Sequence, residues 1–277
     1  SKGNVIDPRV LVNKYGVDAI RYYLVKELNF GQDGLYSEEA LVNRINYDLA
    51  NDLGNLISRT AAMILRYFNG QIPAVGEKAE VDEELKQAAL KAYEEATHQL
   101  DRLDFNAYIN AVMRLVSRAN KYIDETQPWV LAKDPQQNHR LATVMYNLAE
   151  CIRIAVIMLA PTMPTLAQRV NEQIKFWEDV SALTWEEAGQ WGQVRPGSPV
   201  QKGEVLFPRI DMKKEDTAVN ESVHNEPVNP EKPAVEEKKE DQYITIDEFA
   251  RMDLRVAEVI ACEKMPKADK LLILRLK

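Results

Sequence analysis

Asn55 and Arg59 carry the side chains in this sequence that are best suited to binding another molecule, and they lie four residues apart. In a helix, that spacing puts both side chains on one face. An Asn amide and an Arg guanidinium each form paired hydrogen bonds, which suits them to reading the edges of nucleobases. We expect the same face to hold Asp48, Asp52 and Arg66. The alternative is an ordinary solvated face, on which Arg59 pairs with Asp52 or with another acid.

Trp129 follows Pro128 at a break between two predicted helices. An indole at such a corner can stack on an unpaired base, as in proteins that bind single-stranded RNA. The alternative is a tryptophan that closes the end of a helical bundle, since tryptophan is usually well buried. Arg114, Arg118 and Lys121 lie on the helix that leads to this corner, where they would contact phosphates or form ordinary surface charge.

Residues 1–210 contain no pattern that indicates catalysis: the sequence has no nucleophile elbow, no P-loop and no HExxH motif there. The three histidines are scattered along the chain, and Cys151 and Cys262 lie far apart without a CxxC neighbour. We therefore expect no metal site and no disulfide framework, which is typical of the reducing cytoplasm. By composition and spacing alone, this part of the chain is predicted to be a binding module.

The net charge of −8 over 277 residues argues against a protein that grips nucleic acid through a broad cationic surface, but it leaves local RNA contacts open. We see no apolar run of about 18 residues and no secretory signal at the N-terminus, so we expect no membrane span. Residues 211–241 carry 5 basic and 10 acidic side chains, by count over the printed sequence. Much of the negative charge therefore lies in this segment.

The elements that must position these side chains are helices, because apolar residues recur at spacings of three and four through residues 1–210. Asp7, Ser37 and Asp104 are predicted N-caps, and Gly16, Asn69 and Pro161 are predicted stops. The helix from about 136 to 159 has a wide apolar face, which indicates a central position in a bundle. The predicted helices cover about 8–15, 17–27, 38–68, 82–103, 105–125 and 136–159, with a short helix after Pro164.

The predicted fold class is therefore mainly α, an antiparallel helical bundle with short connections. Residues 176–210, which contain Trp177, Trp185 and Trp191, are predicted to be irregular and to pack back on the bundle. Residues 211–241 lack aromatic residues, and we expect them to form a disordered acidic linker. A bundle has no chemistry of its own, so function must come from exposed residues that packing does not explain.

Several stretches taken together resemble bacterial methionyl-tRNA synthetase, a class I aminoacyl-tRNA synthetase. Residues 1–8 (SKGNVIDP) are similar to the sequence that leaves the family's KMSKS loop, and residues 16–23 (GVDAIRYY) to its stem-contact segment. Residues 53–59 (LGNLISR) match its anticodon-reading helix, and residues 127–129 (QPW) match the corner that stacks on the anticodon. The resemblance extends from residue 1 to about residue 210, and it implies a class I anticodon-binding helical bundle.

The resemblance also implies roles for individual residues. Asn55 and Arg59 would hydrogen-bond the bases of a CAU anticodon, mainly the first, and Trp129 would stack beneath that base. Ser1 and Lys2 would be what remains of the KMSKS loop, whose preceding residues are missing. We therefore expect the fragment to lack the adenylation site and to bind no cofactor, whereas the parent enzyme would use ATP and Mg²⁺ to join methionine to its tRNA in the cytoplasm.

Residues 242–277 are predicted to be the truncated start of an OB-type tRNA-binding domain. Residues 245–248 form a capping box before a short helix, residues 254–260 alternate as in a strand, and 268–270 form a turn into a strand at 271–276. The stretches 253–256 (DLRV) and 268–271 (ADKL) carry the resemblance. In the family this domain binds tRNA and mediates homodimerisation, but an OB fold needs five strands, so we expect this piece to be unstable.

The predicted domains are 1–36 (end of the KMSKS loop and stem-contact segment), 37–210 (anticodon-binding bundle), 211–241 (linker) and 242–277 (truncated OB-type domain). Two other functions stay open at this stage. One is a stand-alone tRNA-binding or scaffold protein, against which the KMSKS remnant argues. The other is the anticodon domain of another class I synthetase, such as the valine, isoleucine or cysteine enzyme. Against it stands the combination of Asn55, Arg59 and Trp129 with the OB-type segment.

Overall fold

The computed structural model of the 277-residue chain divides into two compact units, Ser1–Val223 and His224–Lys277, which we describe separately. The described residues are 7–28, 30–31, 34–211, 259–264 and 272–276. The predicted KMSKS remnant (Ser1 and Lys2), the capping box at 245–248 and nearly all of the predicted linker lie outside these ranges.

The first unit is mainly α, as the sequence predicts. A pair of short helices and a long helical stretch are followed by a helical hairpin, a single turn, the central helix and an irregular tail. The elements are α1 (Pro8–Tyr15), α2 (Val17–Glu27), α3 (Glu38–Arg44), η1 (Ile45–Gly54), α4 (Asn55–Tyr67), α5 (Glu80–Asp101), α6 (Phe105–Thr126), α7 (Pro128–Leu131), η2 (Pro135–Gln137), α8 (Asn138–Leu159), α9 (Leu166–Asn171), η3 (Val180–Ala182) and η4 (Trp185–Gly189).

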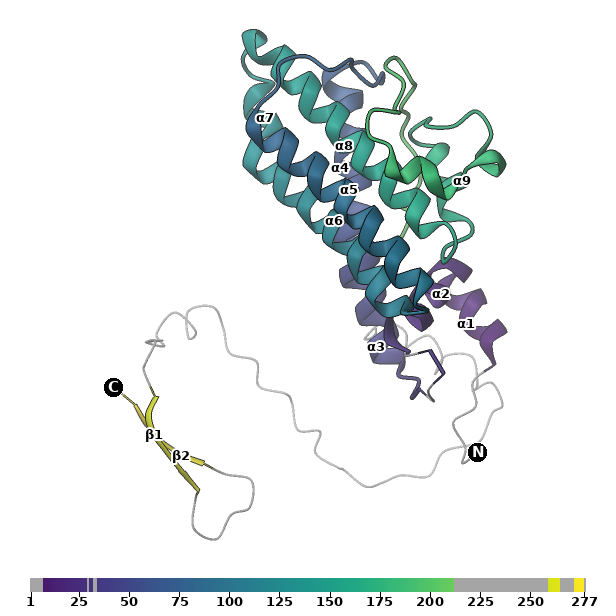
Figure 1. The fold of residues 1–277 in the computed structure, drawn as a ribbon, viewed down its shortest axis with the longest axis vertical. Coiled ribbons are helices and arrows are strands. Elements are labelled where there is room, and N and C mark those ends of the chain that lie inside the picture. Colours follow the sequence, from purple (N-terminus) through teal and green to yellow (C-terminus); the bar gives the residue numbers. More distant parts are fainter. Residues whose placement is uncertain (1–6, 29, 32–33, 212–258, 265–271, 277) are drawn as a thin grey trace, which may run out of the picture. The chain divides into compact units, whose positions relative to one another are not determined.

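The long helices lie side by side as a bundle, with α7 at one end and α1, α2 and α3 at the other (Figure 1). Helices α5 and α6 form an antiparallel hairpin, and Leu103 turns the chain between them with φ of 58°. Asp104 then caps α6, because its carboxylate accepts a hydrogen bond of 3.0 Å from the backbone N–H of Ala107. The predicted caps at Asp7 and Ser37 are confirmed in the same way.

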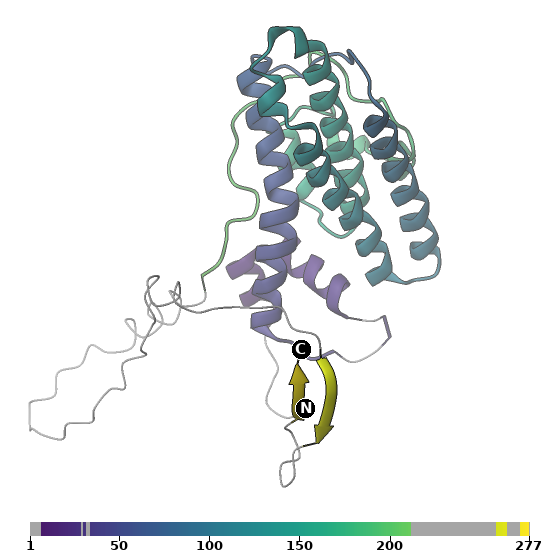
Figure 2. The ribbon, with the colours of Figure 1, turned by 90° about the vertical axis from the view of Figure 1, so that its left-hand side faces the viewer.

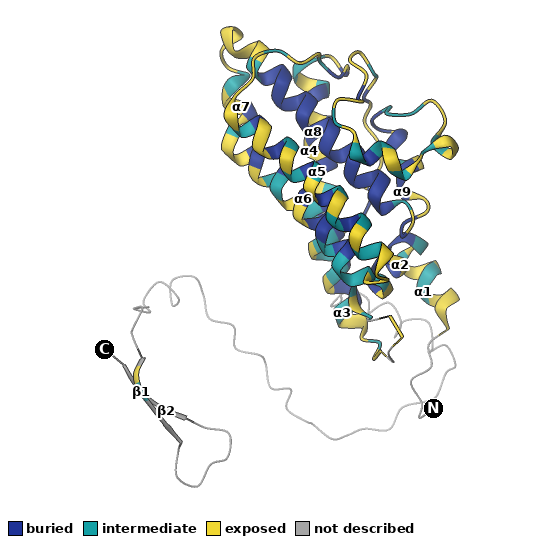
Figure 3. Cartoon of the chain, viewed as in Figure 1, coloured by how far each residue is buried: buried dark blue, intermediate teal, exposed yellow. Residues whose placement is uncertain are grey.

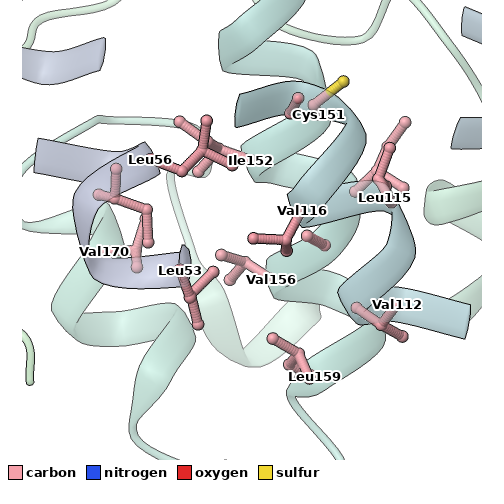
Figure 4. Close-up of a cluster of buried hydrophobic side chains, with 14 of the residues drawn as sticks. Leu53, Leu56, Val112, Leu115, Val116, Cys151, Ile152, Val156, Leu159 and Val170 are labelled. Atoms are coloured by element: carbon pink, nitrogen blue, oxygen red, sulfur yellow. The ribbon is translucent and has the colours of Figure 1, made fainter. Parts of the chain in front are cut away.

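Helix α8 forms the centre of the core. Every residue from Leu141 to Leu159 is buried, which explains the breadth of its apolar face (Figure 3). Leu53 and Leu56 from the long helical stretch and Val116 from α6 point towards Ile152 and Val156 of α8 (Figure 4). The segment Pro135–Leu159 is long and apolar enough to cross a membrane, but its most apolar window is entirely inside the bundle, as expected for a core helix.

The predicted helix over 38–68 is continuous, but its middle is not α-helical. The ten residues Ile45–Gly54 form a π-helix, η1, and the N–H of Asn55 donates to the carbonyl oxygens of Ala50, five residues back, and of Asp52. Helices α3 and α4 adjoin this segment on either side, so one helical stretch runs along the bundle (Figure 2). The sequence analysis did not predict the π-helix.

The irregular tail packs back on the bundle, as predicted. The Trp185 indole donates a hydrogen bond of 2.9 Å to the Thr97 hydroxyl on α5. Trp177 and Trp191 are partly buried against the core. The tail ends as an extended strap, residues 199–211, which runs along the long helical stretch (Figure 2). Asn46 on η1 holds the strap through two hydrogen bonds of 2.9 Å with the backbone of Ile210.

In the second unit the structure describes an antiparallel pair of strands, β1 (Val259–Lys264) and β2 (Leu272–Leu276). Cys262 pairs with Leu274, and the register is irregular between Val259 and Ala261. Strand β2 confirms the strand predicted at 271–276. Residues 254–258 of the other predicted strand, and the predicted turn at 268–270, lie outside the described residues.

Candidate nucleic-acid interface

Asn55 is the first residue of α4 and Arg59 follows one turn later, and both side chains are exposed. The apolar side of the same turn is fully buried, since Leu56 and Ile57 have no exposed surface. Core packing therefore fixes the helix while the amide and the guanidinium face outwards. Among the described residues, the side-chain amide of Asn55 has no hydrogen-bond partner.

Arg59 faces helix α6. Its guanidinium lies 3.7 Å from a carboxylate oxygen of Asp124, and the two side chains are 43% and 69% exposed. An ion pair this exposed contributes about 0–1 kcal/mol, because water screens both charges. The alternative in which Arg59 pairs with an acid is thus realised, but with Asp124 rather than Asp52. Because this ion pair is weak, separating the Arg59 guanidinium from Asp124 would cost little free energy.

Trp129 lies on α7, at the corner that follows α6. Gln127 turns the chain with φ of 45°, and Pro128, at the first position of α7, is the buried residue of the corner. Trp129 itself is 41% exposed. Pro128 is therefore the residue of the corner that packs inside the bundle, and much of the surface of the Trp129 indole is exposed.

Contacts of the long helical stretch, η1 and α4, with α6 place Arg59 beside the end of α6 that leads to Trp129. The Asn120 amide on α6 donates 3.1 Å to the backbone oxygen of Asp52, and further along both helices Asp124 meets Arg59. The two helices therefore run in the same direction. Trp129 follows Asp124 by five residues, so their Cα atoms are at most roughly 18 Å apart.

Asp48, the first residue of the predicted polar stripe, is engaged by neighbouring helices. Its carboxylate accepts a hydrogen bond of 2.8 Å from Tyr22 on α2 and lies 3.6 Å from Arg44 on α3. Burial, and then the nearby Asp48, raise the pKa of Asp52.

The three basic residues on α6 are paired with acids. Arg114 forms an ion pair with Glu95 of α5, and Arg118 pairs with Glu84 at 3.2 Å and with Glu125 at 2.8 Å. Lys121 lies 3.4 Å from Glu125. These contacts favour the alternative of ordinary surface charge over dedicated phosphate contacts.

A cavity of ≈260 Å³ borders Asn55 on the side away from α6. Its walls are Asn55 and Ser58 of α4 and the strap residues 203–207. Asn55 thus has the cavity on one side and Arg59 on the other. Sequence reasoning missed both the strap and Asp124 as neighbours of the site, because neither has a signal in the local pattern around residue 55.

Side chains that could bind a metal ion do not gather in the described part of the chain. Across the described ranges, no group of three or more His, Cys, Asp or Glu side chains is close enough to hold a metal ion. Cys151 is a free, fully buried thiol on α8 and burial strongly raises its pKa, so it is held as the neutral thiol. The exposed polar chemistry of this end of the bundle is therefore that of hydrogen bonding and stacking.

Comparison with known families matches two parts of the chain. Residues 82–266 match the anticodon-binding domain of tRNA ligases, and residues 1–61 match the class I tRNA synthetases of the methionine type. The first match begins in α5 and includes Trp129, and the second ends within α4 and includes Asn55 and Arg59.

Relatives of the whole chain are methionine–tRNA ligases. The chain is 47% identical over 279 aligned residues to the enzyme of Caldanaerobacter subterraneus and 45% identical over 277 to that of Halalkalibacterium halodurans. Both alignments cover 100% of this chain and 42% of the relative. The chain therefore spans less than half the length of these curated relatives.

Solved structures agree with this relationship. The ligand-free methionyl-tRNA synthetase of Mycobacterium tuberculosis superposes with a TM-score of 0.69 at 34% identity, covering 76% of this chain and 42% of the other. The same enzyme bound by methionyl-adenylate gives a TM-score of 0.69 at 35% identity, covering 75% and 41%. This chain belongs to the anticodon-binding domain family of tRNA ligases, among relatives that are methionyl-tRNA synthetases.

Proposed function

We propose that this chain is the anticodon-recognising portion of a methionine–tRNA ligase and that it reads a CAU anticodon through Asn55, Arg59 and Trp129. One observation carries the proposal: two exposed hydrogen-bonding side chains on adjacent turns of α4 lie beside the helix that leads to an exposed indole. The relatives at 44–47% identity, all methionine–tRNA ligases, support methionine as the specificity.

The proposed reading follows from the hydrogen-bonding edges of the bases. A cytosine presents two acceptors, N3 and O2, and one amino donor. The fork of an Arg guanidinium suits the two acceptors, and the oxygen of an Asn amide suits the donor. Uracil carries a donor at N3 and an acceptor in place of the amino group, so it would meet Arg59 and Asn55 with the wrong pattern. An indole beneath the base adds stacking that does not depend on sequence.

A titration of the 277-residue chain with RNA stem-loops tests this proposal. We expect a loop with the anticodon CAU to bind more tightly than one with UAU, and more tightly than a loop of scrambled sequence. Anisotropy of a fluorescent label on the RNA measures all three at one salt concentration, because phosphate contacts depend strongly on salt. Equal affinity for the three loops would contradict the proposal.

The activity of the parent enzyme follows as part of the proposal. It would join methionine to its tRNA through an adenylate formed from ATP, with Mg²⁺, in the cytoplasm. We assign neither ATP nor Mg²⁺ to residues of this chain. The chain's own residues would select the tRNA.

We also propose that residues 242–277 belong to an OB-type tRNA-binding domain through which the parent forms a homodimer. The antiparallel pair β1 and β2 is compatible with two strands of such a domain. Sedimentation of the parent with and without this domain would test the assignment, since only the longer protein is expected to sediment as a dimer.

The stand-alone RNA-binding or scaffold protein and the anticodon domain of another class I synthetase receive less support. The match of residues 1–61 to class I synthetases of the methionine type argues against both. If the chain instead preferred the anticodon stem-loop of a tRNA that another class I synthetase charges, the same titration would favour the anticodon domain of that synthetase.

A further inference from the structure

The π-helical segment η1 ends directly before the candidate interface. The N–H of Asn55 donates to the backbone oxygens of Ala50, five residues back, and of Asp52, whereas in an α-helix it would donate to the fourth residue back, Asn51. A turn closed over five residues contains one residue more than an α-helical turn. Asn55, which we propose reads a base, is therefore also the residue at which α4 begins after the π-helix.

The pattern of burial indicates that the long helical stretch contains one extra residue. Leu41 and Val42 of α3 and Ile45 at the start of η1 are buried, and residues 56, 57, 60, 61 and 64 of α4 are buried after the segment. On an uninterrupted α-helix the mean directions of these two groups would differ by about 90°. One additional residue accounts for about 100° of rotation. The wide turn thus brings the buried sides of α3 and α4 onto the same core.

Gly54 permits the wide turn. A Cβ atom on this residue would lie 2.9 Å from the carbonyl oxygen of Leu49, which is closer than real Cβ atoms approach such an atom. The backbone angles of Gly54, φ −62° and ψ −42°, are ordinary helical values, so the close approach and not a special torsion requires glycine. Leu53 and Leu56, on either side, are fully buried and point into the core, which holds the backbone in place (Figure 4).

We propose that Gly54 is a positioning residue for anticodon recognition, because it maintains the wide turn that sets the rotation of Asn55 and Arg59 about the axis of α4. This inference rests on the proposed function. With a normal α-helical turn in its place, either Leu53 and Leu56 would leave the core, or α4 would be rotated by about 100° about its axis relative to its present orientation. Arg59 would then no longer face Asp124 and the corner that carries Trp129.

The test is the substitution Gly54→Ala in the 277-residue chain. Alanine favours an α-helix over glycine by about 1 kcal/mol, and its Cβ opposes the approach of Leu49. We expect the preference for the CAU loop over the UAU loop to fall at least tenfold while helicity by circular dichroism is retained. Tyr47→Ala is the matched control, since Tyr47 lies in the same segment and is 64% exposed, and it should leave the preference unchanged.

A second variant separates positioning from general damage. Deletion of Tyr47 removes one residue from η1 and lets an α-helix connect α3 and α4 with both buried sides in phase. We expect the combined variant, Tyr47 deletion with Gly54→Ala, to regain the preference for the CAU loop that Gly54→Ala loses. The combined variant can be measured even if Gly54→Ala alone does not fold.

The outcomes distinguish the two proposals. A wild-type chain that does not distinguish the loops overturns the proposed function and this inference with it. A selective wild type together with an equally selective Gly54→Ala variant overturns the inference alone. Failure of the combined variant to regain the preference also overturns it, since the phase of the helix would then not be the cause.

Discussion

At the scale of single residues, the contact between Arg59 and Asp124 bears on the proposed role of Arg59 in reading a base. The guanidinium is oriented by a carboxylate 3.7 Å away, yet both side chains keep much of their surface in water. Exchange of this partner for a base costs little, because an exposed ion pair contributes about 0–1 kcal/mol. Binding energy would therefore come mainly from the contacts with the base.

Arg59→Ala is expected to reduce discrimination at the first anticodon base by about 1–3 kcal/mol, which is the usual contribution of a paired hydrogen-bond contact to a base. Arg59→Lys should not restore it, because lysine has no planar fork of donors. The measurement is the ratio of affinities for CAU and UAU loops. Arg66→Ala, two turns further along and also exposed, is the control. An unchanged ratio in Arg59→Ala would remove this residue from the site.

Trp129→Ala is expected to weaken binding of the CAU loop by about 1–3 kcal/mol, the contribution of one base stacked on an aromatic ring. The neighbouring Val130 is 46% exposed and has no aromatic face, so Val130→Ala should change affinity much less. Thermal unfolding of both variants checks that the fold is retained. Equal losses in the two variants would indicate a general effect of the corner and not stacking.

At the scale of elements, a buried ion pair attaches the irregular tail to α8. Arg153 and Glu150 are 2% and 0% exposed and lie 2.9 Å apart. Arg153 also donates to the backbone oxygens of Glu187 and Gln190, at 3.1 and 2.6 Å. Glu150 in turn accepts a hydrogen bond from the backbone of Val194. Two side chains of one helix thus satisfy three backbone groups of the tail.

Arg153→Met should reduce the free energy of unfolding by about 3–5 kcal/mol, since it leaves the Glu150 carboxylate buried without a cation. Addition of Glu150→Gln should recover part of the loss, because the charge is removed and an acceptor for Val194 remains. Urea unfolding followed by circular dichroism measures both. A loss below about 1 kcal/mol in Arg153→Met would show that water or the tail adapts to the unpaired carboxylate.

At the scale of the whole molecule, the bundle is built around tyrosines whose hydroxyls bridge distant segments. Tyr108 on α6 donates to the backbone of Met158 on α8, and Tyr146 on α8 donates 3.0 Å to Val194 in the tail. Burial raises the pKa of each to about 12. Burial also raises the pKa of Tyr22 and Tyr122, which donate to Asp48 and Asp82.

These shifts predict a loss of stability at alkaline pH. A tyrosine whose pKa is raised on folding binds its proton more tightly in the folded state, so its contribution is complete below about pH 10 and is lost as the pH rises towards 12. For Tyr108 the loss amounts to about 2–3 kcal/mol. Tyr108→Phe should be less stable than the wild type at pH 8, and the difference should shrink above pH 10. A constant difference from pH 8 to 11.5 in urea unfolding would contradict this account.

The sequence by itself determined the helical fold, most helix boundaries and the residues of the candidate interface. Helix caps at Asp7, Ser37 and Asp104 and breaks at Gly16 and Pro128 are local features, so the chain around them is enough to predict them. The apolar breadth of residues 141–159 likewise predicted the central helix. These elements follow from interactions between residues within a few positions of one another.

Only the tertiary structure decided the π-helix, the partner of Arg59 and the attachment of the tail. The wide turn at Ile45–Gly54 arises because α3 and α4 must both turn their apolar sides to one core, and core packing outweighs the small preference for α-helix. Asp124 and the strap residues 203–209 meet α4 from far along the chain, and no local pattern encodes such a contact. Long-range packing therefore set the rotation of the helix that presents Asn55 and Arg59.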